Sequence, residues 1–209
     1  MSDALAFEPS TTALLLCDLQ NDFMHADGAY ARGGARSDDI GALPARLAPL
    51  AEAVRQAGGW LISTHFTLVP GRDGTPMISE HLRQMRPFLG HGDFAPGSWG
   101  QSLIDELQPS HIQVEKVAFS AFYMSRLDFV LRRAGVRTLL VAGIVTNGGV
   151  ASTLRDAHVR DYDCVLLADG CAAFSRSAHE ATVASLATIA TVSRCEEMLA
   201  LWSSLDHLG

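Results

Sequence analysis

Three stretches of the sequence hold residues whose types could do chemistry together. Asp18 closes the apolar run LLLC at 14–17, where a carboxylate enters a low dielectric unless it is paired or works as an acid or a base. Lys116 lies at the end of another short predicted strand, in VEKV at 114–117, and its ammonium is a compact charge that can pair with a carboxylate or lose a proton. Lys116 is also the only lysine among 16 basic residues.

The third stretch, AGIVTNGGV at 142–150, leads from an apolar strand through two glycines into a helix. Free N–H groups at the start of that helix would stabilise negative charge that develops on a substrate. Each stretch has a structural explanation as well. Asp18 could cap a turn, Lys116 could extend to solvent, and the glycines could serve only a tight turn.

The elements that must position these groups alternate along the chain. Short apolar runs predict strands at 13–19, 60–66, 113–117, 138–144, 164–168 and 190–193, and helical spacing predicts helices at 40–56, 123–134, 148–161 and 177–188. This order predicts one α/β domain over 1–209, in which a six-stranded parallel sheet carries helices on both faces in three α/β/α layers. Ligands bind such sheets at the carboxyl ends of the strands, near a switch point in strand order, and we expect the three stretches to meet there.

Composition narrows the class of partner. The chain has 48% hydrophobic and 19% charged residues, which is ordinary for a globular domain. A net charge of −7 without a basic stretch argues against nucleic acid and anionic membranes, so we expect a small-molecule substrate. The N-terminal stretch lacks a basic region, and Asp18 interrupts its apolar run, so we expect no signal peptide and a cytoplasmic protein. The four cysteines form no C-x-x-C pair and are predicted to be reduced core residues.

Four strings resemble, in order and spacing, the signature regions of the isochorismatase-like hydrolases, also called the cysteine hydrolase superfamily: LLLCDLQNDF, VEKVAFSAF, AGIVTNGGVASTLRDA and LLADGCAAFSRSAHEA. The resemblance implies that Asp18 and Lys116 are catalytic, and that the usual nucleophilic cysteine is replaced here by Gly149. It also implies a cis peptide bond between Ile144 and Val145 that turns N–H groups into an oxyanion site, and a homodimer or homotetramer.

The glycine at 149 changes the expected chemistry. In amidase members of the family a thiolate attacks an amide or ureido carbonyl, and Gly149 has no side chain with which to do this. The strings FSRSAH and FSAF resemble the isochorismatases, in which an aspartate protonates a vinyl ether and water adds. We therefore expect a hydrolase that uses Asp18, Lys116 and water, with Gly149 leaving room for the substrate. Lys116 would lower the pKa of Asp18, whereas a general acid needs it raised, so burial must outweigh the ion pair.

Two alternatives stay open. The chain could be a cysteine amidohydrolase whose nucleophile has been replaced, by design or by natural loss, or a non-catalytic homologue that only binds a small molecule. The stretch IVTN at 144–147 is more typical of amidase members, so this region is a hybrid that looks most like family members of unassigned substrate.

Further residues are candidates for contact with the substrate because they flank Asp18, Lys116 or the glycine loop: Gln20, Phe23, Phe119, Phe122, Tyr123, Val145 and Thr146. Arg83 and Arg86 lie in the irregular segment 68–110 and could bind a substrate carboxylate in a bidentate manner. His65 lacks the aspartate two residues earlier that metal-binding relatives carry, so we predict neither a metal nor a cofactor and expect His65 at a strand end.

Overall fold

The structure is a computed structural model that describes residues 8–205, and its centre is a parallel sheet of six strands in the order β3-β2-β1-β4-β5-β6. The strands are β1 Thr12–Cys17, β2 Trp60–Phe66, β3 Ile112–Lys116, β4 Thr138–Ile144, β5 Asp163–Ala172 and β6 Thr191–Ser193. The order changes direction between β1 and β4, which is the switch point of a doubly wound sheet. The predicted fold class is therefore confirmed.

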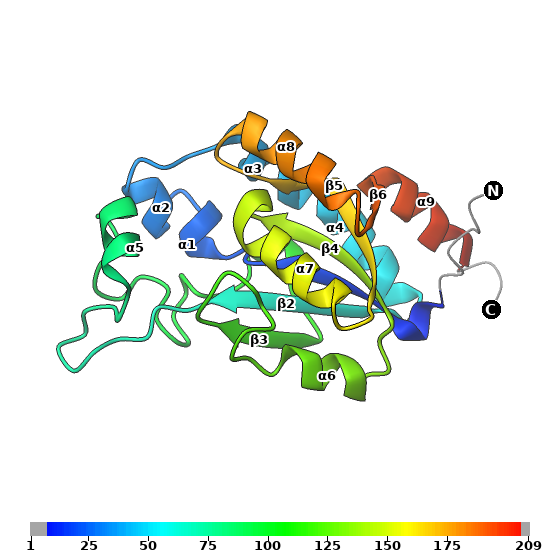
Figure 1. The fold of residues 1–209 in the computed structure, drawn as a ribbon, viewed down its shortest axis with the longest axis horizontal. Helices are drawn as coiled ribbons and strands as arrows, with labels where there is room; N and C mark the ends of the chain where they lie inside the picture. The colour runs from blue at the N-terminus through cyan, green and yellow to red at the C-terminus, as the bar shows by residue number, and fades with distance from the viewer. Residues whose placement is uncertain (1–7, 206–209) are drawn as a thin grey trace.

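Helices cover both faces of this sheet (Figure 1). One face packs against α6 Leu127–Arg133, α7 Ala151–His158 and α8 Arg176–Leu186, and the other packs against α3 Asp38–Gly41, α4 Leu43–Gln56 and α9 Cys195–Leu205. The amphipathic spacing of α4 explains its position, because Leu43, Leu47, Leu50 and Val54 recur on one buried face.

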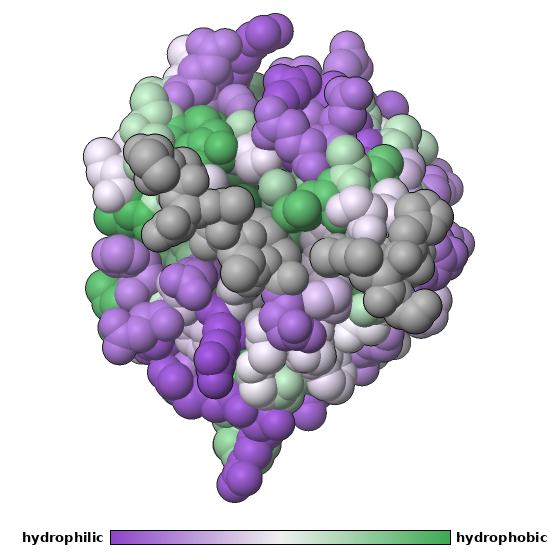
Figure 2. Space-filling view, turned by 90° about the vertical axis from the view of Figure 1, so that its right-hand side faces the viewer, coloured by the Kyte–Doolittle hydropathy of each residue, from purple (hydrophilic) through white to green (hydrophobic). Residues whose placement is uncertain are grey.

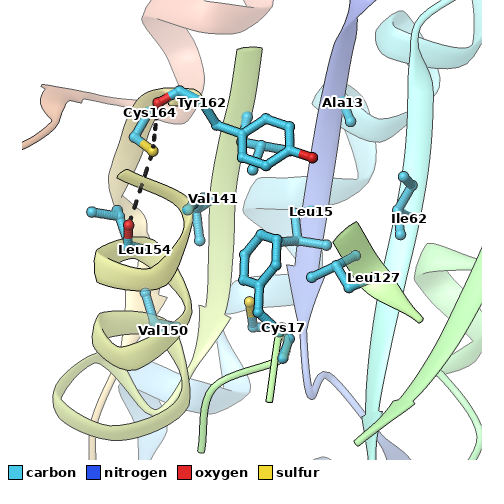
Figure 3. Packing of buried hydrophobic residues seen from close by; sticks show 14 of the residues in the cluster. Ala13, Leu15, Cys17, Ile62, Leu127, Val141, Val150, Leu154, Tyr162 and Cys164 are labelled. Carbon is cyan, nitrogen blue, oxygen red and sulfur yellow. Dashed lines mark hydrogen bonds between the residues drawn. The ribbon is translucent and has the colours of Figure 1, made fainter. Parts of the chain in front are cut away.

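The core on the α7 side reaches up to the end of β1. Figure 3 shows Val150 and Leu154 of the α7 region facing Leu15 and Cys17 of β1, with Val141 of β4 between them. All of these side chains are fully buried and closely packed, so Asp18, which follows Cys17, is attached to a rigid part of the core.

The remaining elements gather at the carboxyl ends of the strands, where β2 points in Figure 1. They are α1 Asn21–Met24, α2 Ala29–Arg32 and α5 Glu80–Met85. Two short 3₁₀ turns lie apart from them: Pro9–Thr11 leads directly into the start of β1, and Asp105–Leu107 precedes β3 and bonds to Arg55 of α4 through the Leu107 carbonyl. The opposite end of the molecule is shown in Figure 2, where hydrophilic residues predominate among the coloured atoms. Within residues 8–205 no helix is long and apolar enough to cross a membrane.

Several predicted helices differ in their bounds from those observed. The helix expected at 40–56 is broken at Ala42, because Pro44 starts a new helix near its first turn. The helix expected at 123–134 begins only at Leu127, since Met124 has a left-handed φ of 50° and the Ser125 hydroxyl accepts the Leu127 N–H. The helix expected at 148–161 is preceded by a π-helical turn, Thr146–Val150, and ends at His158.

Two other elements were mispredicted. β5 runs four residues beyond its predicted end, with a shift in register opposite Gly143 of β4. Helix α9 was not predicted, although Cys195, Met198, Leu199 and Trp202 have helical spacing and Trp202 is completely buried. All four cysteines are free and buried, as predicted.

Candidate functional site

Asp18 is placed by the ends of two neighbouring strands. It follows β1 directly, has a left-handed φ of 57°, and is only 4% exposed. Because Cys17 pairs with Thr64 of β2, the Asp18 N–H donates to the Thr64 carbonyl at 3.1 Å. The Thr64 hydroxyl in turn donates to Asp18 Oδ1 at 2.8 Å. Asp18 is thus held by main-chain and side-chain bonds to the same residue.

Lys116 reaches this carboxylate from the last residue of β3. Its Nζ lies 2.6 Å from Asp18 Oδ2, and its side chain is 2% exposed. Nζ also donates to the carbonyls of Ala118 and Phe119, each at 3.0 Å. An ammonium has three N–H donors, so these three acceptors satisfy all of them. The centroid of the Phe66 ring lies 5.7 Å from Lys116 Nζ.

Gly149 completes the group from the third strand end, β4. A Cβ atom at this position would lie 3.1 Å from Asp18 Oδ2, 3.4 Å from Lys116 Nζ and 3.2 Å from the Ile144 carbonyl oxygen. The structure therefore brings Asp18, Lys116 and Gly149 together at the switch point, and the main chain of Gly149 faces the ion pair directly.

The loop before Gly149 bends sharply. The peptide bond between Ile144 and Val145 is cis, and the Val145 carbonyl accepts N–H bonds from Gly148 at 2.9 Å and Val150 at 3.3 Å. Thr146 is fully buried, and its hydroxyl bonds to Nδ1 of His179 in α8 at 2.8 Å. The Thr146 hydroxyl therefore fastens the loop to α8.

Burial shifts the pKa of the Asp18 carboxyl group upward. Removal of water raises the pKa of Asp18 above its ordinary value, and this effect outweighs the Lys116 charge and the hydrogen bonds from Lys116 and Thr64, which lower it. Of the two opposing effects expected from the sequence, burial is larger than the ion pair, and the raised pKa favours Asp18 as a proton donor.

The nearby thiols are poorly suited to nucleophilic attack. Cys17 precedes Asp18, and burial, followed by the Asp18 charge, raises its pKa to about 12. Burial likewise raises the pKa of Cys171 well above its ordinary value. Both thiols are therefore protonated at neutral pH, and only a thiolate is a strong nucleophile.

Four of the candidate substrate contacts occupy structural positions. Gln20 is fully buried, donates to the carbonyls of Phe66 and Gln101, each at 2.9 Å, and accepts the Phe66 N–H at 2.7 Å. Thr146 is bonded to His179, as described. Phe122 is 6% exposed and packs in the core, 5.9 Å from the Tyr162 ring. Phe23 is half-buried in an aromatic cluster with Tyr30, Phe66 and Phe94.

The other candidates lie nearer to solvent. Phe119 is 66% exposed and Tyr123 is 58% exposed, and only the main-chain carbonyl of Phe119 contacts Lys116. Val145 is half-buried.

His65 is buried and bonds through Nε2 to the Ser63 hydroxyl at 2.8 Å, and burial lowers its pKa to about 4. Within residues 8–205 no group of three or more His, Cys, Asp or Glu side chains is arranged to hold a metal ion.

Tyr30 and Arg86 contact each other from two separate segments of the chain, and the Asp18 charge acts on Tyr30. Tyr30 is buried, and its pKa is raised by burial first and by the Asp18 charge last, while Arg86 lowers it. The Arg86 guanidinium lies 5.8 Å from the Tyr30 ring centroid. Arg86 is half-buried, whereas Arg83 is exposed. Sequence reasoning singled out Arg86 but not Tyr30 or Thr64, whose placement depends on the packing of α2 and on strand register.

Two cavities adjoin this region without including the ion pair. A cavity of about 390 Å³ is bordered by Ala172 of β5 and by His179, the partner of Thr146. A second, of about 340 Å³, is bordered by Phe23 and Phe174, which pack on Tyr30. Asp18 and Lys116 are almost closed to solvent, so neither cavity includes them. We assign the candidate site from the contacts among Asp18, Lys116 and Gly149 and not from the cavities.

Comparison with known proteins identifies the family and supports the fold. Residues 12–197 match the model of the Isochorismatase domain. Ureidoacrylate amidohydrolase RutB of Methylobacterium radiotolerans is 35% identical over an alignment of 201 positions, and the match covers 89% of this chain and 77% of that protein. A cysteine hydrolase from Pseudomonas syringae pv. phaseolicola superposes with a TM-score of 0.82 at 24% identity, covering 98% of this chain and 100% of that one. An isochorismatase family protein from Desulfovibrio vulgaris gives a TM-score of 0.77 at 26% identity, covering 92% and 98%. The chain therefore belongs to the isochorismatase-like hydrolase family.

Proposed function

We propose that this hydrolase acts on a small substrate through acid catalysis by Asp18 and addition of water, without a covalent intermediate. The observation that carries the proposal is the place of Gly149. A side chain there would meet both members of the Asp18–Lys116 pair, yet the residue has none. Since the neighbouring thiols are protonated, water is the available nucleophile.

The raised pKa of Asp18 suits it to give a proton. On a vinyl ether, Asp18 transfers its proton to the terminal enol carbon, and the ether oxygen shares the resulting positive charge as an oxocarbenium ion. Water adds to the oxocarbenium carbon and gives a proton to the Asp18 carboxylate, and the hemiketal collapses to a ketone as Asp18 returns that proton to the oxygen of the leaving alcohol. Lys116 compensates the charge of the Asp18 carboxylate once its proton has left.

Arg86 is the group best placed to bind a carboxylate on the substrate. Its guanidinium packs near Tyr30, whose pKa responds to both Arg86 and Asp18. Among the ion pairs of residues 8–205 none involves Arg86. A guanidinium binds a carboxylate with two parallel hydrogen bonds, which would orient the reacting bond over Asp18.

The second candidate function is amide or ureido hydrolysis, and the 35% identity to a ureidoacrylate amidohydrolase favours it. In that reaction water attacks the carbonyl carbon in place of a thiolate, and N–H groups of the loop that ends at Gly149 stabilise the oxyanion. A homologue that binds a ligand without turnover is the third possibility.

One assay separates these functions. The purified protein is incubated with an enolpyruvyl ether of a cyclic carboxylic acid and with a 3-ureido carboxylic acid, beside the variant Asp18→Asn and the control Asp163→Asn, which alters an exposed carboxylate. We expect Asp18-dependent release of pyruvate from the ether and no turnover of the ureido acid. Ammonia or carbamate release from the ureido acid alone would establish the second function. Turnover of neither substrate, by this chain and its variants alike, would overturn the proposal.

A further inference from the structure

We propose that Thr153 and Asp156 are positioning residues that fasten the 118–121 loop to α7 and so hold the Lys116 ammonium in place against Asp18. The inference rests on the proposed function only in giving Lys116 a part in the reaction. The contacts themselves are independent of any substrate.

The position of the ammonium depends on the loop that follows β3. Two of its three hydrogen bonds go to carbonyls of that loop, those of Ala118 and Phe119. Phe119 is largely exposed, so its own side chain does little to fix the loop. A tether elsewhere in the loop is needed if the two carbonyls are to stay within hydrogen-bond distance of Nζ.

That tether consists of two hydrogen bonds to α7. The Ala121 N–H donates to the Thr153 hydroxyl at 2.9 Å, and the Ser120 hydroxyl donates to Asp156 Oδ2. Thr153 is completely buried and Ser120 is 9% exposed. The other carboxylate oxygen of Asp156 bonds to Arg160 at 3.1 Å, which orients Oδ2 toward the loop.

The same helix also positions Gly149. α7 begins at Ala151, two residues after the glycine, and Thr153 and Asp156 lie three residues apart on one side of it. The helix therefore joins two parts of the site. It continues from the main chain that faces the ion pair, and it anchors the carbonyls that hold the ammonium.

The chain provides its own reporters for a test. Because Lys116 is the only lysine, acylation by acetyl-N-hydroxysuccinimide, mapped by mass spectrometry of peptides, measures its accessibility separately from that of the N-terminal amine. The four buried cysteines report general loosening through their reaction with iodoacetamide. The variants are Thr153→Val and Asp156→Ala, with Thr153→Ser and Asp156→Asn as conservative partners that can still accept a hydrogen bond. Glu52→Ala removes an exposed partner of Arg55 in α4 and serves as the control.

We expect Thr153→Val and Asp156→Ala to speed acylation of Lys116 by about tenfold or more at a temperature below unfolding, because the local opening that frees the amine becomes easier. Cysteine reactivity should stay at the parent level, and Thr153→Ser, Asp156→Asn and Glu52→Ala should behave like the parent. Once a substrate is turned over, the two disruptive variants should also lose kcat by about tenfold with little change in KM.

Three results would overturn the proposal: unchanged acylation in Thr153→Val and Asp156→Ala, a parallel rise in cysteine reaction that marks general destabilisation, or failure of the conservative variants to restore the parent rate. Absence of turnover would count against the proposed function alone, because the acylation result does not depend on a substrate.

Discussion

Lys116 Nζ and Asp18 Oδ2 lie 2.6 Å apart, although the strands that carry these residues are separated by β2. The lysine side chain crosses the end of β2 beside Phe66 to reach the carboxylate. Thr64, also from β2, bonds to the other carboxylate oxygen. Three neighbouring strand ends thus support one buried acid, and its chemistry should respond to changes in each of them.

Replacement of Asp18 should separate its chemical role from its structural one. Asp18→Asn keeps the shape and can still accept the Thr64 hydrogen bond, but it has no acidic proton, so kcat should fall by about 10²- to 10⁴-fold. Asp18→Ala leaves Lys116 buried without its partner and should lower the free energy of unfolding by about 3 kcal/mol or more. Steady-state assays and urea unfolding test the two effects, and an Asp18→Asn enzyme with parent activity would exclude general acid catalysis.

Activity should decline as pH rises. The folded-state pKa of Asp18 is raised by burial, so the protonated acid persists above the range of an ordinary aspartate and is lost as pH passes the raised value. The contribution of Asp18 to the free energy of unfolding should also decrease as pH rises. The contribution of this group is complete below the unfolded pKa of about 3.9 and disappears as pH rises through the folded value. A pH profile of kcat and unfolding curves at several pH values test this, and a rate that increases with pH would instead indicate Asp18 acting as a base.

Thr64 offers a way to move that pH profile. Its hydroxyl stabilises the ionised Asp18, so Thr64→Val should raise the pKa of Asp18 further and shift the falling limb of the profile to higher pH. Thr64→Ser keeps the hydroxyl and should retain the parent profile. Loss of the hydrogen bond should also cost about 1 kcal/mol of folding stability. Equal shifts in both variants would show that the methyl group, and not the hydroxyl, matters.

Gly149→Cys tests whether the site still supports thiol chemistry. The new Cβ would lie 3.1 Å from Asp18 Oδ2, so the pair must move by a few tenths of an ångström, at a cost of about 1 kcal/mol or more. We expect iodoacetamide to modify the thiol introduced at position 149 selectively, and any gain in ureido hydrolysis should disappear on alkylation. Gly41→Cys adds a thiol where a Cβ meets nothing within 4 Å, and it should gain no activity. Equal gains of ureido hydrolase activity in Gly149→Cys and Gly41→Cys would show that the activity does not depend on a thiol at position 149.

Arg86→Gln should weaken binding of a carboxylate-bearing substrate. Removal of a charge-assisted hydrogen bond typically costs about 1.5–3 kcal/mol, which corresponds to a rise in KM of about 10- to 100-fold. Arg83→Gln, which alters an exposed arginine of α5 three residues earlier, is the matched control and should behave like the parent. Equal effects in both variants would point to a general role of charge in this segment.

Much of the architecture was predictable because it depends on local patterns. The apolar runs that become β1, β2 and β4 are fully or nearly fully buried, and their continuous hydrophobicity indicates a sheet covered on both faces. Asp18 and Lys116 were singled out because a charged residue at the end of such a run is conspicuous, whereas Gly149 was singled out only by the resemblance to the isochorismatase-like hydrolases. Helix α9 was missed even though its spacing was readable.

The sequence by itself determined the alternation of strands and helices along the chain and the chemical types available at the strand ends: one carboxylate, one ammonium and one pair of glycines. Only the tertiary structure decided which neighbours act on them. Thr64 bonds to Asp18 because parallel pairing sets Thr64 beside Cys17, and Gln20 and Phe122 become structural contacts because of loop packing. The reason is physical: residue type and spacing are local properties, whereas strand register, loop packing and the burial that raises the pKa of Asp18 arise from contacts between distant segments.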